Sequence, residues 1–111
     1  MPGITHIVLF QLKAGLSAEA VNDFCTRMLG LKDNCLHPTS QKPYILSASG
    51  GVDNSPEGHQ NGITHAFVVE FANAEDRDYY VEKDPTHLEF VGTLKGIVEK
   101  VQVVDYTSGV F

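Results

Sequence analysis

The segment Thr5–Lys13 (THIVLFQLK) restricts the fold most, because it is apolar on both of the faces that a β-strand presents. Alternation along a strand divides the side chains into two sets on opposite faces: His6, Val8, Phe10 and Leu12, and Ile7 and Leu9. A strand with one face in water would alternate between apolar and polar residues. The pattern therefore predicts a strand that is covered on both faces.

Capping residues and local composition define the other elements. Helices are predicted over about 18–32, 74–81 and 85–99, after the N-cap residues Ser17, Asn73 and Asp84. Further strands are predicted over 44–49, 63–71 and 100–106, where apolar, β-branched and aromatic residues concentrate. The segment GGVDNSPEGHQNG, rich in Gly and Asn, predicts a loop that could act as a flap.

The order β-α-β-β-α-α-β is typical of an α+β, ferredoxin-like fold, in which a four-stranded antiparallel sheet has helices on one face. The chain of 111 residues predicts a single domain, 1–111. The helices would leave the opposite sheet face bare, with Ile7, Leu9, Val68 and Val104 on it. Because an uncovered apolar face marks an interaction surface, we expect a homodimer in which two such faces pack together.

Composition and charge argue against several classes of function. The chain has 8 basic and 14 acidic residues and a net charge of -6, which disfavours binding to nucleic acid. No segment offers the ~20 apolar residues that cross a bilayer, and the N-terminal MPGITHIVLFQLK resembles a strand more than a signal peptide. Cys25 and Cys35 form no CxxC pattern and are expected to be reduced, structural thiols of a cytoplasmic protein.

The sequence lacks the usual motifs for metals and phosphate-containing cofactors. The histidines form neither HxxxH nor HExxH on a helix, and the segment SGGVDNSPEG lacks the GK[ST] ending of a phosphate-binding loop. We therefore expect neither a metal ion nor a cofactor.

His6 and His65 occur in similar contexts, THIVLF and THAFVV, on the strand faces that the helices are expected to cover. If the two strands are neighbours, the two histidines are expected to lie side by side. They are then either core histidines with local hydrogen bonds, or polar groups in an otherwise apolar pocket that Phe67 also lines.

The stretch VEKDPTHLEF places His87 in the first turn of the helix that Asp84 and Pro85 begin. Either His87 only occupies this capped turn, or it is a reactive group. The positive end of a helix disfavours imidazolium, so His87 would be a neutral proton acceptor. Tyr80, on the preceding helix, could bring a hydroxyl near it, and such a pair suits acid–base catalysis on an enolisable substrate.

The stretches THIVLFQLKAGLS, GITHAFVVEF, DYYVEKDPTHLEFV and VEKVQVVDY, in this order, resemble the stress-responsive A/B barrel (Dabb) family over about residues 4–106. The resemblance implies a ferredoxin-like protomer whose dimer closes into an α/β barrel. Most members have no established reaction. One plant branch is a polyketide cyclase that catalyses an intramolecular aldol condensation with a histidine of an HPAH element and a preceding tyrosine.

Carried over to this chain, the resemblance implies that His87 matches the catalytic histidine and that Asp84 replaces the first histidine of the HPAH element. The catalytic tyrosine best matches Tyr80, with Tyr79 as a rival, because this chain has one more residue before the proline. The cyclase's cavity histidines match His6 and His65. A tyrosine on its first helix falls at Met28, which removes one polar group.

We therefore expect a small dimeric stress-responsive A/B barrel protein whose hydrophobic pocket binds a small organic molecule, for example an aromatic or polyketide-like compound. The alternative is a cofactor-independent, polyketide cyclase-like lyase that uses His87 and Tyr80. The sequence leaves open whether the protein is an enzyme.

Overall fold

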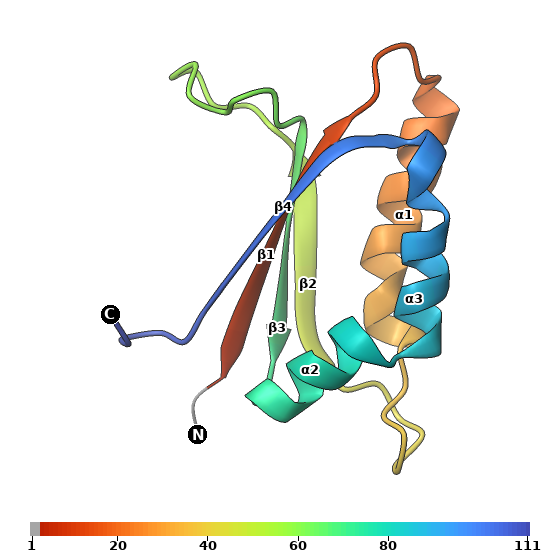
Figure 1. The fold of residues 1–111 in the computed structure, drawn as a ribbon, viewed down its shortest axis with the longest axis vertical. Helices are drawn as coiled ribbons and strands as arrows, with labels where there is room; N and C mark the ends of the chain where they lie inside the picture. The colour runs from red at the N-terminus through yellow and green to blue at the C-terminus, as the bar shows by residue number, and fades with distance from the viewer. Residues whose placement is uncertain (1–2) are drawn as a thin grey trace.

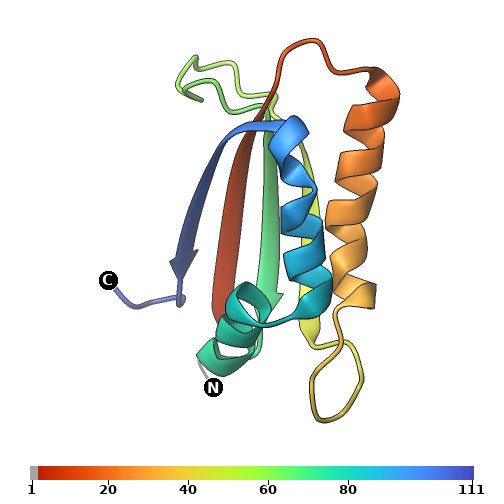
Figure 2. The same cartoon turned by 45° about the vertical axis from the view of Figure 1, so that its right-hand side comes forward.

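The computed structural model describes residues 3–111 and confirms the α+β, ferredoxin-like fold. Its elements follow in the order β1 (Ile4–Leu12), α1 (Ala18–Asn34), β2 (Ile45–Val52), β3 (His65–Phe71), α2 (Ala74–Glu82), α3 (Pro85–Gly92), the 3-10 helix η1 (Leu94–Gly96) and β4 (Val98–Tyr106). The strands form one antiparallel sheet in the order β2-β3-β1-β4. Helices α1, α2 and α3 cover one face of the sheet (Figures 1 and 2).

The capping residues predicted from the sequence are confirmed. The side chains of Ser17, Asn73 and Asp84 each accept a hydrogen bond from a backbone amide in the first turn of α1, α2 and α3, respectively. These bonds satisfy amides that have no partner within their own helix. Each helix therefore begins where a local sequence signal places it.

The prediction that the third helix extends to about residue 99 is wrong. Helix α3 ends at Gly92, and the Thr93 hydroxyl donates a hydrogen bond to the Phe90 carbonyl at 2.7 Å. Gly92 and Gly96 are weak helix formers, so only the short η1 follows. Strand β4 consequently begins at Val98, two residues before the predicted start.

Strand β2 is longer than predicted, because it continues through Gly50 and Gly51 to Val52. Gly50 pairs with Phe67 of β3, and a Cβ atom at Gly50 would lie 2.1 Å from the Phe67 ring. Only glycine leaves room for this aromatic ring at that position. The first residues of the predicted loop therefore belong to the sheet, and the loop itself occupies 53–64.

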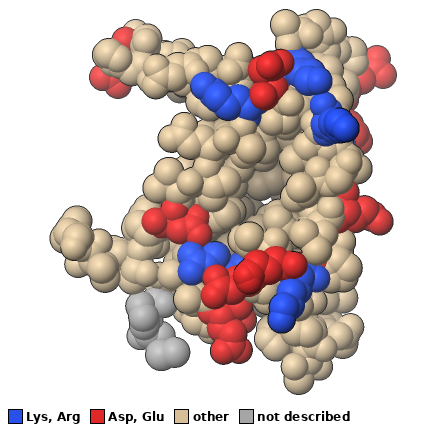
Figure 3. Space-filling model, in the orientation of Figure 1, with Lys and Arg blue, Asp and Glu red and all other residues tan. Residues whose placement is uncertain are grey.

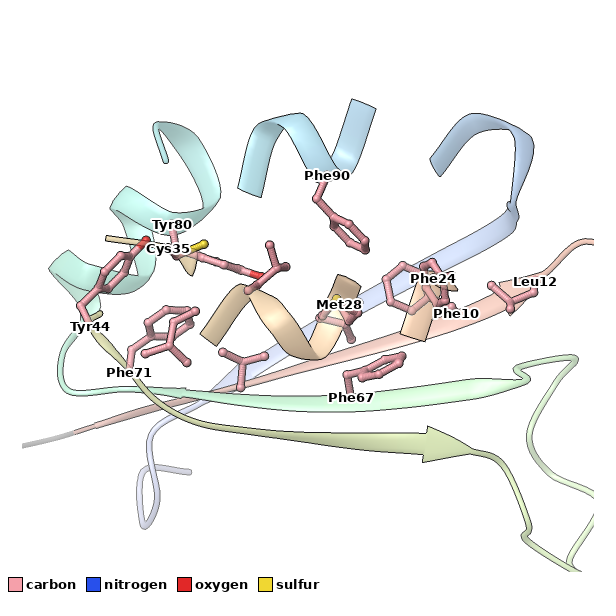
Figure 4. Close-up of a cluster of buried hydrophobic side chains, with 14 residues drawn as sticks. Phe10, Leu12, Phe24, Met28, Cys35, Tyr44, Phe67, Phe71, Tyr80 and Phe90 are labelled. Carbon is pink, nitrogen blue, oxygen red and sulfur yellow. The ribbon is translucent and has the colours of Figure 1, made fainter. Parts of the chain in front are cut away.

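The core lies between the sheet and the helices. Figure 4 shows aromatic and aliphatic side chains of both layers in contact, with Phe24, Phe67, Phe71 and Tyr80 at most 1% exposed. Phe24 packs edge-on against Phe10, with ring centroids 5.0 Å apart. As predicted, the helix-covered face of β1 and β3 carries the apolar set that also includes His6 and His65.

The opposite face of the sheet is not covered by any described element of the chain. Its apolar residues, here called the open sheet face, are Ile7, Leu9, Ala66, Val68, Val104 and Tyr106. Val104 and Tyr106 are each 49% exposed. In residues 3–111, no helix has the length and apolar character needed to cross a membrane.

Candidate functional site

A cleft of about 470 Å³ opens between the sheet and the helices, on the side where β4 forms the sheet edge. Its walls are mostly apolar and include Val8, Met28, Phe90, Val101 and Val103. Figure 3 shows a hollow in this face, with charged side chains gathered beside it. Apolar clefts with a few polar groups are the usual form of small-molecule sites.

The cleft exists because none of the described helices packs directly over β4. Val101 and Val103 stand opposite Phe10 and Val8 of β1, so they face the helix layer. They are nevertheless 53% and 51% exposed. Figure 2 shows β4 at the edge of the sheet beyond the helices.

His87 and Tyr80 meet in this cleft, where the short link between α2 and α3 folds the two helices together. Their rings stack, with centroids 3.9 Å apart and planes at 27°. An imidazole nitrogen accepts hydrogen bonds in the ring plane, and within residues 3–111 no hydrogen bond joins the Tyr80 hydroxyl to His87. The phenol ring of Tyr80 thus holds the imidazole ring flat against it, and the hydroxyl of Tyr80 does not hydrogen-bond to His87.

Burial sets the charge state of His87. Desolvation lowers the pKa of His87 below its usual value of 6.5, and the neighbouring His6 acts in the same direction. The Tyr80 carbonyl and the Asp84 carboxylate both raise the pKa of His87, but together they raise it less than desolvation and His6 lower it. Nδ1 of His87 is buried and has no hydrogen-bond partner among the described residues. The site therefore holds a neutral imidazole.

His6 is fixed by an acidic residue of β4. Its Nδ1 lies 2.7 Å from Oδ1 of Asp105, and the other carboxylate oxygen accepts a hydrogen bond from Arg77 at 2.8 Å. A carboxylate accepts hydrogen bonds, so Nδ1 of His6 carries the proton and Nε2 is the nitrogen available to the cleft. The His6 ring also meets Tyr80 edge-on, at a centroid distance of 5.9 Å.

Sequence reasoning missed Asp105 and Arg77. A signal for Asp105 was present, because alternation along β4 places it on the same face as Val101 and Val103. An acidic residue on a face that is otherwise apolar calls for a partner. Arg77 of α2 had no comparable signal, since only the tertiary fold brings α2 to β4.

The structure brings together four of the residues singled out from the sequence: His6, Met28, Tyr80 and His87 all line the cleft. Tyr79, the rival of Tyr80, packs against Tyr44 at a centroid distance of 5.8 Å, outside the cleft.

The expectation that His6 and His65 lie side by side is wrong. In the antiparallel register, His6 stands opposite Val69, and His65 stands opposite Phe10. Each histidine lies near the beginning of its strand, and the two strands run in opposite directions, so the histidines fall at opposite ends of the strand pair. His65 lines a different hollow and contacts Thr64, with 2.9 Å between its Nδ1 and the Oγ1 of Thr64. Phe67 is 1% exposed and packs in the core.

A buried polar cluster supports the link between α2 and α3. Asp84 is 1% exposed and accepts hydrogen bonds from the amides of Thr86 and His87 and from the Tyr44 hydroxyl, the last at 2.5 Å. Burial and the nearby Asp84 carboxylate raise the pKa of Cys35 to about 12. Cys35 is therefore an unreactive buried thiol.

Taken together, the cleft offers a neutral imidazole, a second histidine oriented by a carboxylate, and a phenol, all within apolar walls. Such a set can accept a hydrogen bond or a proton from a ligand that lies against apolar walls. Among residues 3–111, no group of three or more His, Cys, Asp or Glu side chains is arranged to hold a metal ion.

Comparison with known proteins relates this architecture to one family. Residues 4–108 match the Stress responsive A/B Barrel Domain, Dabb. The Stress-response A/B barrel domain-containing protein HS1 of Arabidopsis thaliana is 29% identical over 103 residues, which cover 93% of this chain and 87% of the relative.

Solved structures share the fold. A hydroxynitrile lyase from Passiflora edulis has a TM-score of 0.82 at 24% identity and covers 98% of this chain and 96% of its own. A dimeric, ferredoxin-like protein of unknown function from Bacteroides fragilis has a TM-score of 0.62 at 24% identity, with 95% of each chain covered. At these identities the two structures show a common fold alone. Since the family match spans nearly the whole sequence, the chain belongs to the stress-responsive A/B barrel (Dabb) family.

Proposed function

We propose that this protein is a homodimer in which the cleft of each protomer binds a small, mostly apolar organic molecule, with His87 accepting a hydrogen bond from it. The observation that carries the proposal is the neutral His87 imidazole, which is stacked on Tyr80 inside an otherwise apolar cleft. Nδ1 of His87 is buried, so the ligand would donate its hydrogen bond to Nε2.

The open sheet face supports the dimer. Its apolar side chains are continuous across β3, β1 and β4, and a two-fold axis would bury two copies of this face against each other. The dimeric Bacteroides fragilis protein shares the fold and shows that such protomers can associate. The cleft lies on the other side of the sheet, so this association leaves it accessible.

Ligand binding can be tested with N-phenyl-1-naphthylamine, an uncharged apolar dye that fluoresces when it leaves water. We expect saturable binding, with one dye per protomer. Val103→Phe places a larger side chain in the cleft and should weaken binding at least about tenfold, because filling a site excludes its ligand.

The matched control is Val52→Phe, at an exposed position of the far edge strand β2, which should bind the dye as the wild type does. Dye fluorescence that does not saturate, or that Val103→Phe leaves unchanged, would exclude the cleft as the binding site.

A second candidate function is cofactor-independent proton transfer, as in a cyclase-like lyase. The arrangement of His87, Tyr80 and the Asp105-bound His6 around one cleft favours it. His87 would remove a proton from a carbon next to a carbonyl, and the Tyr80 hydroxyl would donate a hydrogen bond to the enolate oxygen. Met28 stands where the cyclase of the family has a tyrosine, so the substrate would differ from that of the cyclase.

Proton transfer predicts hydrogen–deuterium exchange at the methyl group of acetophenone in heavy water. Only neutral His87 can act as the base, and its pKa lies below 6.5. The exchange rate should therefore be constant above about pH 6.5 and fall as the pH decreases through the lowered pKa. His87→Gln should reduce the rate at least about 100-fold while leaving the fold and the dimer intact. Equal exchange in the variant and the wild type would exclude His87 as a base.

A further inference from the structure

The mouth of the cleft is built from two apolar walls that face each other across an open slot. On the β4 side stand Val101 and Val103, and on the helix side stand Val81 and Val91, which are 40% and 45% exposed. A ligand that reaches His87 would leave its apolar part between these walls. This arrangement fits an elongated molecule with a polar end inside and an apolar body in the slot.

The charges at the cleft are mostly acidic. Asp78, Glu82 and Asp105 line it, and Arg77 is the one Lys or Arg side chain among the lining residues of the described chain. Figure 3 shows acidic and basic side chains side by side next to the hollow. The protein as a whole has a net charge of -6, so its overall field also opposes the approach of anions.

Arg77 is already occupied by protein carboxylates. Its Nε donates to Asp78 at 2.7 Å, and its Nη1 donates to Asp105 at 2.8 Å. Asp105 in turn holds His6. An anionic ligand could bind Arg77 only by displacing these carboxylates from it. Displacing Asp105 would also disturb the contact that orients His6. The guanidinium is therefore a structural clamp between α2 and β4 and does not serve as an anion receptor.

The histidines do not compensate for this acidic surplus. His87 is neutral, and any proton that His6 gains is matched by Asp105 in direct contact with it. Among the lining residues of the described chain, three carboxylates outnumber the single cation of Arg77, so a ligand carboxylate or phosphate in the cleft would meet a net negative charge. An uncharged ligand avoids this repulsion and can still donate a hydrogen bond to His87.

We propose that the cleft selects uncharged organic molecules with a hydrogen-bond donor at one end and an apolar body, and rejects carboxylates and phosphates of the same shape. This inference rests on the proposed function, since it specifies the class of ligand that the same cleft takes. Asp78 and Glu82 are the residues that set the selectivity, because they stand at the mouth without contacting His6.

The test is displacement of N-phenyl-1-naphthylamine by 4-butylbenzamide and by 4-butylbenzoate, which have nearly the same shape and differ in charge. At neutral pH and low salt, the amide should displace the dye at a concentration at least about tenfold lower than the carboxylate. High salt should reduce this ratio, because ions screen the charges at the cleft mouth.

The double variant Asp78→Asn/Glu82→Gln should improve displacement by the carboxylate about fivefold and leave the amide unchanged. The control Asp33→Asn/Glu57→Gln changes the net charge equally at exposed positions outside the cleft, and it should behave as the wild type. If the dye does not bind, the proposed function fails, and this inference fails with it. If the dye binds but the carboxylate competes as well as the amide, or the double variant leaves the ratio unchanged, only the charge selectivity is overturned.

Discussion

Asp84→Ala is expected to lower the free energy of unfolding by about 3–5 kcal/mol, as measured by urea denaturation. The substitution leaves two helix amides and the Tyr44 hydroxyl without their shared acceptor in a region that is almost fully buried. Loss of an N-cap typically costs about 1 kcal/mol, and each buried polar group left without a partner costs about 1–3 kcal/mol more. Because the cap also fixes the link between α2 and α3, the stacking of His87 on Tyr80 should loosen.

Tyr44→Phe is the matched control, because it removes one hydrogen bond to Asp84 and keeps both amide bonds. It should cost about 1–2 kcal/mol, because one oxygen of the buried Asp84 carboxylate loses the hydroxyl. A destabilisation by Asp84→Ala no larger than that of Tyr44→Phe would show that the cluster does not hold the two helices together.

Val104→Lys is expected to raise the dissociation constant of the proposed dimer at least about 100-fold. The residue is 49% exposed in the protomer and lies on the open sheet face. Two-fold symmetry would place two lysines in the interface, and an unpaired buried charge costs several kcal/mol. Analytical ultracentrifugation across a range of protein concentrations measures the change.

Val101→Lys provides the control for the dimer. Val101 lies on the same strand, points to the other face and is 53% exposed, so a lysine there adds the same charge outside the proposed interface. The Val101→Lys protein should remain a dimer. Dissociation of both variants, or of neither, would contradict association through the open sheet face.

The fold could be predicted from the sequence because its determinants are local. Alternation identified both faces of β1, and Ser17, Asn73 and Asp84 marked the helix starts. The errors occurred at element ends that tertiary packing determines. Gly50 lies in a Gly-rich segment that predicts a loop, and only the pairing with Phe67 places it in a strand. Similarly, η1 interrupts a helical pattern that has no proline to end it.

The candidate site was only partly accessible to sequence reasoning. His87 stood out because the capped start of a helix has a defined electrostatic character. Tyr80 stood out because it lies on the helix just before that start. The register between β1 and β3 separates His6 from His65, which matching sequence contexts could not show. The Asp105 contact to His6 joins residues 99 positions apart, so it depends on the sheet order.

The most direct test of the central claim is nitrogen-15 NMR of the histidine side chains during titration with N-phenyl-1-naphthylamine. His6 and His87 line the cleft, whereas His65 lines a separate hollow, so the chain contains its own internal control. The account predicts saturable shifts of the His87 and His6 imidazole nitrogens and none for His65. Shifts at His65 alone, or no histidine shift at saturating dye, would contradict a ligand site built around His87.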